Sequence, residues 1–374
     1  MMDSETQAEQ VRMCASCPKM CRHICPTFNA WRSDSPTPHG RALLLHYENI
    51  GTRKLDKRAI EVLYQCLECS HCLTWCVPGI DIASIIESAR TRIVSQNRHP
   101  KELDRMRDSI INSHNPFDEP HANRNSWFHP KRKGVKSIIY FSGCTASYRE
   151  QSIAKDTVEL LEFLDYRVNL SPDEFCCGSP LFRTGFDKDA RSQAEHNVKV
   201  LNSMDGDIIV ATCPGCYRAL VDDYSLLGFD LNKPVEHISQ LLDHELQDTK
   251  DLMPGKRITY HDPCHLGRHR GEYEAPRSVI KKITGHEPIE MERNRDNATC
   301  CGNGAGLRTL FPEYAQKIGS SRLQDARQIE AELIVTACPF CKNMLEKESK
   351  EQIEVLDLPE LVLGILKSRE AKHD

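Results

Sequence analysis

The sequence lacks the features that would place the chain in a membrane. Hydrophobic residues make up 39 % of its 374 residues, below the roughly 45–50 % of an ordinary globular protein. No apolar stretch approaches the about 20 residues that a membrane-spanning helix requires. The longest candidate, 358–366, is interrupted by Pro359, Glu360 and Gly364. We therefore expect membrane contact only through a partner.

Export signals, basic patches and nucleotide-binding motifs are also missing. The N-terminus has neither the basic start nor the apolar core of a signal peptide, so we expect a cytoplasmic location, with any peripheral membrane association made through a partner subunit. The formal net charge is −5, with lysine and arginine scattered among acidic residues, which offers no basic face to nucleic acid. No Gly-x-Gly-x-x-Gly follows a strand and opens a βαβ unit, so a flavin or nicotinamide would belong to another subunit.

Cysteine, in contrast, is abundant, with eighteen residues. Without an export signal a disulfide framework is disfavoured, and metal binding is the first interpretation. Ten cysteines form two modules with one order of parts: a lone cysteine after an apolar run, a Cys-Cys-Gly, and a Cys-Pro-x-Cys after a second apolar run. The spacings are nearly equal, which indicates a duplication. The modules comprise Cys144, Cys176, Cys177, Cys213 and Cys216, then Cys264, Cys300, Cys301, Cys338 and Cys341.

Five thiols per module exceed the four that a tetrahedral zinc or an ordinary cubane cluster uses. Adjacent cysteines cannot easily chelate one metal from a single strand, but they can straddle two irons. This favours an expanded iron–sulfur cluster, and it leaves open a cubane beside a free thiol that attacks a disulfide. The candidate catalytic residues are the paired cysteines Cys176, Cys177, Cys300 and Cys301.

The other eight cysteines form two runs, each followed closely by proline. They are Cys14, Cys17, Cys21 and Cys25, then Cys66, Cys69, Cys72 and Cys76. The second run has the bacterial ferredoxin spacing with its proline displaced by one residue, and the first has one extra residue between its second and third cysteines. In ferredoxins the fourth cysteine ligates the other cluster. By analogy Cys76 would join Cys14, Cys17 and Cys21, and Cys25 would join the second run. Zinc fingers are the alternative.

Apolar periodicity predicts helices at 41–47, 58–64 and 80–94. We expect a helical, ferredoxin-like domain with two [4Fe-4S] clusters over residues 1–100. Residues 101–135 are predicted to be a linker or docking strap, because Asn-Pro, Glu-Pro and His-Pro pairs break the periodicity. In this segment Asn123, Arg124 and Trp127 could make specific contacts.

From residue 136 short apolar runs alternate with helix-length segments, which predicts one α/β domain over 136–250 and a second over 251–374. Helices are expected at 147–164 and 187–203. The expected strands are 135–142, 207–212 and 234–238, then 257–261, 332–337 and 353–358. Cysteines follow four of these strands, at the carboxyl edge where open α/β sheets bind ligands and where helix N-termini stabilise negative charge. The expected fold class is a multidomain α+β protein, its two α/β modules related by a pseudo-twofold axis.

The second module carries distinctive sequences: Tyr-His-Asp-Pro-Cys-His-Leu-Gly-Arg ending at Arg268, Cys-Cys-Gly-Asn-Gly-Ala-Gly ending at Gly306, and Ala-Cys-Pro-Phe-Cys ending at Cys341. Together with the N-terminal runs, they resemble the CCG-domain iron–sulfur family over most of the chain. The resemblance is strongest to the D subunits of heterodisulfide reductases. Similar layouts occur in the iron–sulfur subunits of glycolate oxidase, lactate-utilisation proteins and anaerobic glycerol-3-phosphate dehydrogenase.

The resemblance implies two cubane [4Fe-4S] clusters on the N-terminal cysteines and a noncubane [4Fe-4S] cluster on each set of five. It also implies an oxidoreductase that acts on a sulfur group as one subunit of a complex. A membrane cytochrome b or an FAD-containing dehydrogenase subunit would exchange electrons with it. A disulfide such as CoM-S-S-CoB would be cleaved, or formed, between two equivalent noncubane clusters. The alternative is an electron relay from an FAD-dependent 2-hydroxyacid or glycerol-3-phosphate dehydrogenase to a quinone or cytochrome.

Two further features have both functional and ordinary interpretations. His261 and His265 flank Cys264 and could hydrogen-bond a cluster sulfur, or they could pack without that role. Arg268, His269 and Arg270 could receive an anionic substrate tail, or they could be exposed side chains on a solvated loop.

Overall fold

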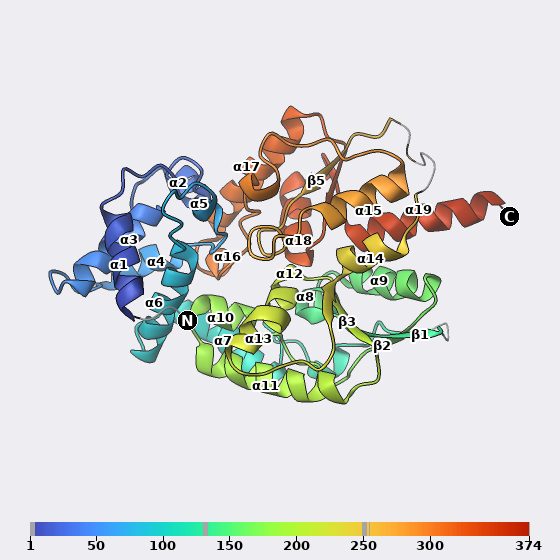
Figure 1. Ribbon diagram of the computed structural model, residues 1–374, viewed down its shortest axis with the longest axis horizontal. Coiled ribbons are helices and arrows are strands. Elements are labelled where there is room, and N and C mark those ends of the chain that lie inside the picture. Colours follow the sequence, from blue (N-terminus) through green and yellow to red (C-terminus); the bar gives the residue numbers. More distant parts are fainter. Residues whose placement is uncertain (1–3, 130–133, 249–252, 254, 374) are drawn as a thin grey trace.

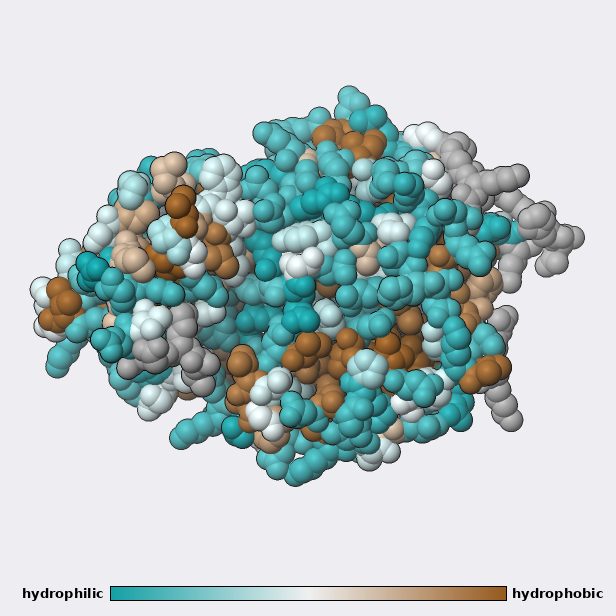
Figure 2. Space-filling view, viewed as in Figure 1, coloured by the Kyte–Doolittle hydropathy of each residue, from teal (hydrophilic) through white to brown (hydrophobic). Residues whose placement is uncertain are grey.

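The computed structural model describes residues 4–129, 134–248, 253 and 255–373. The chain forms an N-terminal helical region, a first module (136–248) and a second module (255–373), which contact one another (Figure 1). No helix in the described part of the chain combines the length and the apolarity needed to cross a membrane. Figure 2 shows a mainly hydrophilic face on which hydrophobic side chains gather over the N-terminal helices and the first module.

In the described part of the N-terminal region the chain forms six helices. They are α1 (Ser4–Ala15), α2 (Pro26–Trp31), α3 (Pro38–Asn49), α4 (Lys57–Tyr64), α5 (His71–Thr74) and α6 (Ile82–Ser95). Two begin at aspartate caps: Asp56 accepts a hydrogen bond from the Ala59 amide, and Asp81 accepts from Ala83 and Ser84. Such caps satisfy amides that lack intrahelical partners. The predicted helices 41–47, 58–64 and 80–94 are confirmed as α3, α4 and α6.

The segment predicted as a linker is folded against its neighbours. It contains the short turns η1 (Lys101–Leu103) and η2 (His121–Asn123) around helix α7 (Asp104–Ser113). Leu103, Ile110 and Trp127 are buried in the main hydrophobic core. We call residues 101–129 the strap, because they connect the N-terminal helices to the first module while packing against it.

The first module is a parallel sheet of strand order β2-β1-β3-β4 with helices around it. Its strands are β1 (Lys136–Phe141), β2 (Tyr166–Asn169), β3 (Ile208–Ala211) and β4 (Val235–His237). Its helices are α8 (Gly143–Tyr148), α9 (Gln151–Phe163), α10 (Ser179–Thr184), α11 (Asp187–Ser203), α12 (Pro214–Arg218), the π-helical turn η3 (Ala219–Asp223), α13 (Tyr224–Leu226) and α14 (Ile238–Glu245). Strand β2 was not predicted, and the single helix expected at 147–164 is divided into α8 and α9.

The second module repeats this plan with a parallel sheet of order β5-β6-β7. Its strands are β5 (Ile258–His261), β6 (Leu333–Thr336) and β7 (Glu354–Asp357). Its helices are α15 (Glu274–Thr284), η4 (Arg295–Asn297), α16 (Leu307–Leu310), α17 (Pro312–Gln328), α18 (Pro339–Ser349) and α19 (Leu358–His373). Strands β5 and β6 are buried throughout, as expected for parallel strands covered on both faces.

The two modules pack through helices that each contributes to the other. Helix α19, at the C-terminal end, lies against α9 of the first module, and α14 lies against α15 (Figure 1). Lys367 of α19 pairs with Glu159 of α9 at 2.8 Å. This packing fixes the edges of the two sheets relative to each other.

Candidate metal centre

All ten cysteines of the two modules line one cavity of about 590 Å³. Nine of them are buried, and Cys264 is half-buried. The cavity lies between the modules, because residues of both form its wall. The structure therefore brings together two sets of five thiols that lie in separate parts of the sequence.

Four of these cysteines occupy corresponding places after strands. Cys144 lies in the first turn of α8, directly beyond β1, and Cys264 follows β5. Cys213 and Cys338 are the residues before Pro214 and Pro339, where α12 and α18 begin. Proline suits a first helical turn because it needs no amide donor there. The positive ends of these helices favour the negative charge of thiolates.

The paired cysteines are held in tight turns by glycine. Gly178 and Gly302 follow the pairs with φ angles of +80° and +94°, which side chains rarely allow. A Cβ on Gly302 would lie 2.5 Å from the carbonyl oxygen of Ala315, so helix α17 passes against the turn. On Gly178 the corresponding contact is the carbonyl oxygen of Ala190 in α11, at 3.5 Å. By these contacts Gly178 corresponds to Gly302, and Ala190 corresponds to Ala315.

The cavity thiols lie close together, and hydrogen bonds between them shift their pKa values in opposite directions. Hydrogen bonds from Cys176 and Cys216 lower the pKa of Cys177 to about 6. Because Cys216 donates the hydrogen bond to Cys177, its own pKa is raised well above the usual value, and burial adds to the rise. In the second module Cys341 Sγ and Cys301 Sγ are 3.4 Å apart. So many buried sulfur ligands without a disulfide among the described residues fit the all-thiolate environment that iron–sulfur clusters require.

The two modules also meet through their cysteines. Hydrogen bonds from Cys216 and Cys338 hold the pKa of Cys213 well below its ordinary range. Cys213 belongs to the first module and Cys338 to the second. The two sets of thiols therefore adjoin across the cavity.

The eight N-terminal cysteines gather in two neighbouring groups. Burial raises the pKa of Cys14 to about 12, and the adjacent Cys21, Cys17 and Cys76 add to the rise. Cys76 thus lies with the first run although it belongs to the second. Burial likewise raises the pKa of Cys72, with contributions from Cys66, Cys69 and Cys25. The mutual repulsion of these thiolates is the kind that a bound cation relieves.

One N-terminal cysteine reaches the second module. A hydrogen bond from Cys300 is the largest of the effects that lower the pKa of Cys69 to about 6. Arg268 Nε donates to the carbonyl oxygen of Cys69 at 2.5 Å, and His269 Nε2 lies 2.7 Å from the carbonyl oxygen of Glu68. The junction joins the second cysteine run to the second module.

This junction corrects the interpretation of residues 268–270 as a solvated loop. Arg268 also donates to the carbonyl oxygens of Asp296 and Ala298, and Arg270 pairs with Asp222. Both arginines make contacts between parts of the chain and are half-buried, so they are not freely exposed side chains on a solvated loop. None of the three lines the cavity.

The two histidines near Cys264 lie in different places. His265 lines the cavity, its Nδ1 is buried without a partner, and burial holds its pKa well below the ordinary value. His261 lies instead with Cys301 and Cys341, since the three ligand atoms are within 4.8 Å of one another. The two histidines therefore do not lie together beside Cys264, because the end of β5 directs the side chain of His261 to the other cysteines.

The strap supplies cavity residues that the cysteine motifs gave no reason to include. Arg105, Met106 and Phe117 line the cavity. Arg124, which is 1 % exposed, pairs with Glu174 and donates from Nη1 to Cys144 Sγ at 3.7 Å. The specific contact expected of Arg124 is confirmed. The helical spacing of Leu103, Met106 and Ile110 was the signal that could have revealed α7.

The two α/β modules, each with five cysteines on a shared cavity, define a class of cysteine-rich protein. Comparison with known families identifies the same class. The cysteine-rich domain named CCG matches twice, at residues 138–221 and 258–346. The chain is also 34 % identical over 390 aligned positions to the D subunit of the dihydromethanophenazine:CoB–CoM heterodisulfide reductase of Methanosarcina barkeri, covering 96 % of this chain and 95 % of that one. The chain belongs to the CCG family and, within it, to the relatives of the heterodisulfide reductase D subunits.

Two other similarities are more distant. The EtfAB:quinone oxidoreductase of Syntrophomonas wolfei is 29 % identical over 81 % of this chain and 46 % of its own length. The crystal structure of a hypothetical protein from Helicobacter pylori superposes with a TM-score of 0.56 at 12 % identity, covering 87 % of this chain and 68 % of that one. This second similarity concerns the fold alone.

Proposed function

We propose that the chain is the iron–sulfur subunit of a heterodisulfide-reductase-type oxidoreductase, which reduces or forms a disulfide of low molecular weight such as CoM-S-S-CoB. The observation that carries the proposal is the single cavity lined by all ten cysteines of the two modules. Cleavage of one disulfide takes two electrons and yields two thiols. Two metal centres that face one space match that stoichiometry. The relationship to the D subunit of a heterodisulfide reductase supports the proposal.

The donor sets suit four clusters. In the N-terminal region Cys14, Cys17, Cys21 and Cys76 would hold one cubane, and Cys66, Cys69, Cys72 and Cys25 the other. The interactions of Cys76 with Cys14 and of Cys25 with Cys72 support this crossed assignment. Each set of five cavity cysteines would hold a noncubane [4Fe-4S] cluster. When bound, the clusters supply the two electrons, one at each sulfur of the disulfide.

The chain's own residues orient the substrate and limit access to it. Cys176, Cys177, Cys300 and Cys301 are the proposed catalytic residues, because they line the cavity and would hold the clusters that exchange electrons with a disulfide bound there. Met106 and Phe117 of the strap form an apolar part of the wall. Apolar walls keep water from the reacting sulfurs and leave the substrate tails to extend towards the opening.

Electrons exchange with a partner at the N-terminal region. Cys17, Cys21 and Cys76 are half-buried, and the nearby Met20 and Val77 are 60 % and 96 % exposed. Exposed apolar side chains around a redox group are typical of a docking surface. We infer a membrane cytochrome b or an FAD-containing dehydrogenase subunit as the partner. The contact of Cys69 with Cys300 then leads inward to the second module.

Substitution of one cysteine in each pair tests the catalytic claim. Cys177→Ser and Cys301→Ser should each abolish reduction of a small disulfide by the reconstituted, chemically reduced protein. The rate is measured from thiol release under anaerobic conditions. Ser179→Ala, which changes another cavity residue without removing a sulfur, is the matched control. Unchanged thiol release in both cysteine variants would defeat the proposal.

The second candidate function is an electron relay between a flavoprotein and a quinone or cytochrome. It is favoured by the similarity to an EtfAB:quinone oxidoreductase. A relay passes electrons from a reduced flavoprotein to a quinone analogue without any activity on disulfides. Quinone reduction by the wild-type protein, with no thiol release from a range of small disulfides, would select the relay.

A further inference from the structure

The two modules differ at the residue that ends their first strand. Phe141 ends β1 and His261 ends β5, and both are buried, at 0 % and 1 % exposure. Each lies three residues before the lone cysteine of its module, Cys144 or Cys264. A histidine therefore stands in the second module where the first has a phenylalanine. The sequence-based expectation of two equivalent metal centres does not hold at this position.

His261 is fixed by a buried arginine. Arg322 of α17, which is 1 % exposed, donates from Nε to His261 Nδ1 at 3.0 Å. Its Nη1 donates to the carbonyl oxygen of Arg293 at 2.7 Å and lies 3.1 Å from Asp325 Oδ2. These contacts hold the guanidinium against the Nδ1 edge of the imidazole.

This contact determines which ring nitrogen carries the proton. A guanidinium has only donors, so Nδ1 must accept and cannot be protonated. The neutral imidazole then carries its hydrogen on Nε2. Nε2 is buried and makes no hydrogen bond to any described residue, while a ring nitrogen of His261 lies within 4.8 Å of the sulfurs of Cys301 and Cys341. An Nε2 that carries a hydrogen has no free lone pair for iron, so His261 is set as a donor to sulfur.

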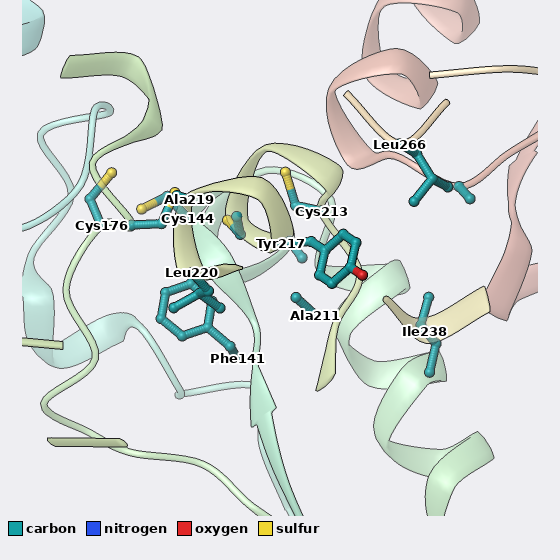
Figure 3. Packing of buried hydrophobic residues seen from close by; sticks show 14 of the residues in the cluster. Phe141, Cys144, Cys176, Ala211, Cys213, Tyr217, Ala219, Leu220, Ile238 and Leu266 are labelled. Atoms are coloured by element: carbon teal, nitrogen blue, oxygen red, sulfur yellow. The ribbon is translucent and has the colours of Figure 1, made fainter. Parts of the chain in front are cut away.

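The first module has neither member of this pair. The alignment of Gly178 with Gly302, and of Ala190 with Ala315, puts Asn197 of α11 at the position of Arg322. Asn197 Nδ2 instead donates to the carbonyl oxygen of Cys176 and to Tyr224 Oη, both at 3.1 Å. Figure 3 shows Phe141 beside Leu220 in the apolar packing next to Cys144 and Cys176. In the first module a charged side chain, Arg124 of the strap, donates to a different cysteine, Cys144.

We propose that His261, oriented by Arg322, is a positioning residue that donates an Nε2–H hydrogen bond to the Cys301 thiolate, and so raises the reduction potential of the second module's metal centre alone. The inference rests on the proposed function, because it requires a cluster on the second set of cysteines. Hydrogen bonds to cluster sulfur stabilise the reduced, more negative state and shift the potential upward. The centre that adjoins Cys69 is thereby made a better acceptor of the incoming electrons.

The test is a redox titration of the reconstituted full-length protein, followed by EPR, together with iron and sulfide analysis. His261→Phe copies the first module and should lower one of the two cavity-cluster midpoint potentials, while the other potential and the iron content stay as in the wild type. His261→Gln, whose amide can still donate, should restore most of the shift. Phe141→Leu is the control and should leave the second module's potential unchanged.

The outcomes separate this inference from the function on which it rests. Absence of iron at the cavity cysteines in the wild-type protein would defeat the proposed function itself. With iron present, an unshifted potential in His261→Phe would overturn the role of His261. Loss of the second module's iron from a folded His261→Phe variant would also overturn it, because that result marks a ligand. If His261→Phe does not fold, His261→Gln decides: a near wild-type potential supports the donor role and a lowered potential contradicts it.

Discussion

Arg90 is a charged residue with no exposed side-chain surface, and it ties the three parts of the chain together. It pairs with Glu68, also 0 % exposed, at 2.6 Å. It also donates to the carbonyl oxygens of Leu63, Cys66, Arg183 and Ala305. These acceptors come from the N-terminal region and from both modules. A single side chain therefore satisfies backbone groups at the junction where the second cysteine run meets the modules.

Replacement of this arginine should be severe. Arg90→Met leaves Glu68 buried without its partner, and removal of one member of a buried pair costs about 3–5 kcal/mol. Lys199→Met breaks the exposed pair with Glu195 and should cost less than about 1 kcal/mol. The comparison is made by anaerobic thermal unfolding of the two variants and the wild type. Equal melting temperatures for both variants would show that the Arg90 network contributes little.

Glycine positions give a second prediction about single residues. Gly302→Ala must place a Cβ 2.5 Å from the Ala315 carbonyl at a φ of +94°, and strained backbone of this kind costs about 1–3 kcal/mol before the clash is added. Gly364→Ala, in helix α19 with no atom near the new methyl group, should stabilise by about 1 kcal/mol. Urea unfolding midpoints of the two variants should therefore move in opposite directions. A stabilised Gly302→Ala would contradict the described turn.

Among the elements, the contact of α9 with α19 joins the modules and carries a titratable group. Burial raises the pKa of Asp156 in α9 to about 6, and the nearby Glu360 of α19 adds to the rise. In the unfolded chain an aspartate titrates near 3.9. The native state therefore holds this proton more tightly. The stability that Asp156 contributes is present below about pH 4 and is lost as the pH rises to about 6.

Asp156→Asn removes this pH dependence. At about pH 7.5 the variant should be more stable than the wild type by about 1 kcal/mol, an amount that allows for solvent screening of a half-buried carboxylate. At about pH 5 the gain should be smaller, because the wild-type carboxyl is then largely protonated. Melting temperatures at the two pH values measure the difference. A larger gain at the lower pH than at the higher one would contradict the assigned sign.

The elements that the sequence predicted best were those with a strong local pattern. Strands β1, β3, β5 and β6 were recognised from apolar runs that end at cysteine or just before it, and α11 from its helical length. Strand β2 was missed because Tyr166 and Val168 are its only buried residues, a pattern too short to distinguish from a loop. Helix α7 was missed because the surrounding prolines suggested a linker. The break between α8 and α9 depends on the Arg149 backbone and has no signal in the apolar spacing.

At the scale of the whole molecule, the cysteines describe a route from the surface to the cavity. The N-terminal group that contains Cys14 also contains half-buried cysteines, and the group that contains Cys72 adjoins it. Cys69 then meets Cys300 of the second module. The ten cavity cysteines were identified from their motifs. The pseudo-twofold relation and the resemblance led us to expect the two sets to face each other. The part that the strap takes in the cavity wall was not predicted, because it depends on how the strap packs against the modules, and the sequence carries no separate signal for that.

On the proposed function, removal of a cysteine from the N-terminal region should separate electron entry from disulfide chemistry. Cys21→Ala should lower the iron content from about sixteen to about twelve per chain. Disulfide reduction driven by a protein electron donor should then be largely lost, whereas reduction by a small dye that enters the cavity should persist. Both rates are measured by thiol release. Equal loss of the two rates would contradict a separate entry site.

The most direct test of the account is the content of iron and acid-labile sulfide in anaerobically purified protein, with EPR spectra recorded after small thiols are added under oxidising conditions. The account predicts about sixteen irons per chain, from four clusters of four, and a paramagnetic signal that appears only with a thiol substrate. About eight irons and no response to any thiol would contradict it. In that case only the N-terminal cysteines would hold clusters, and the cavity between the modules would not be a site of disulfide chemistry.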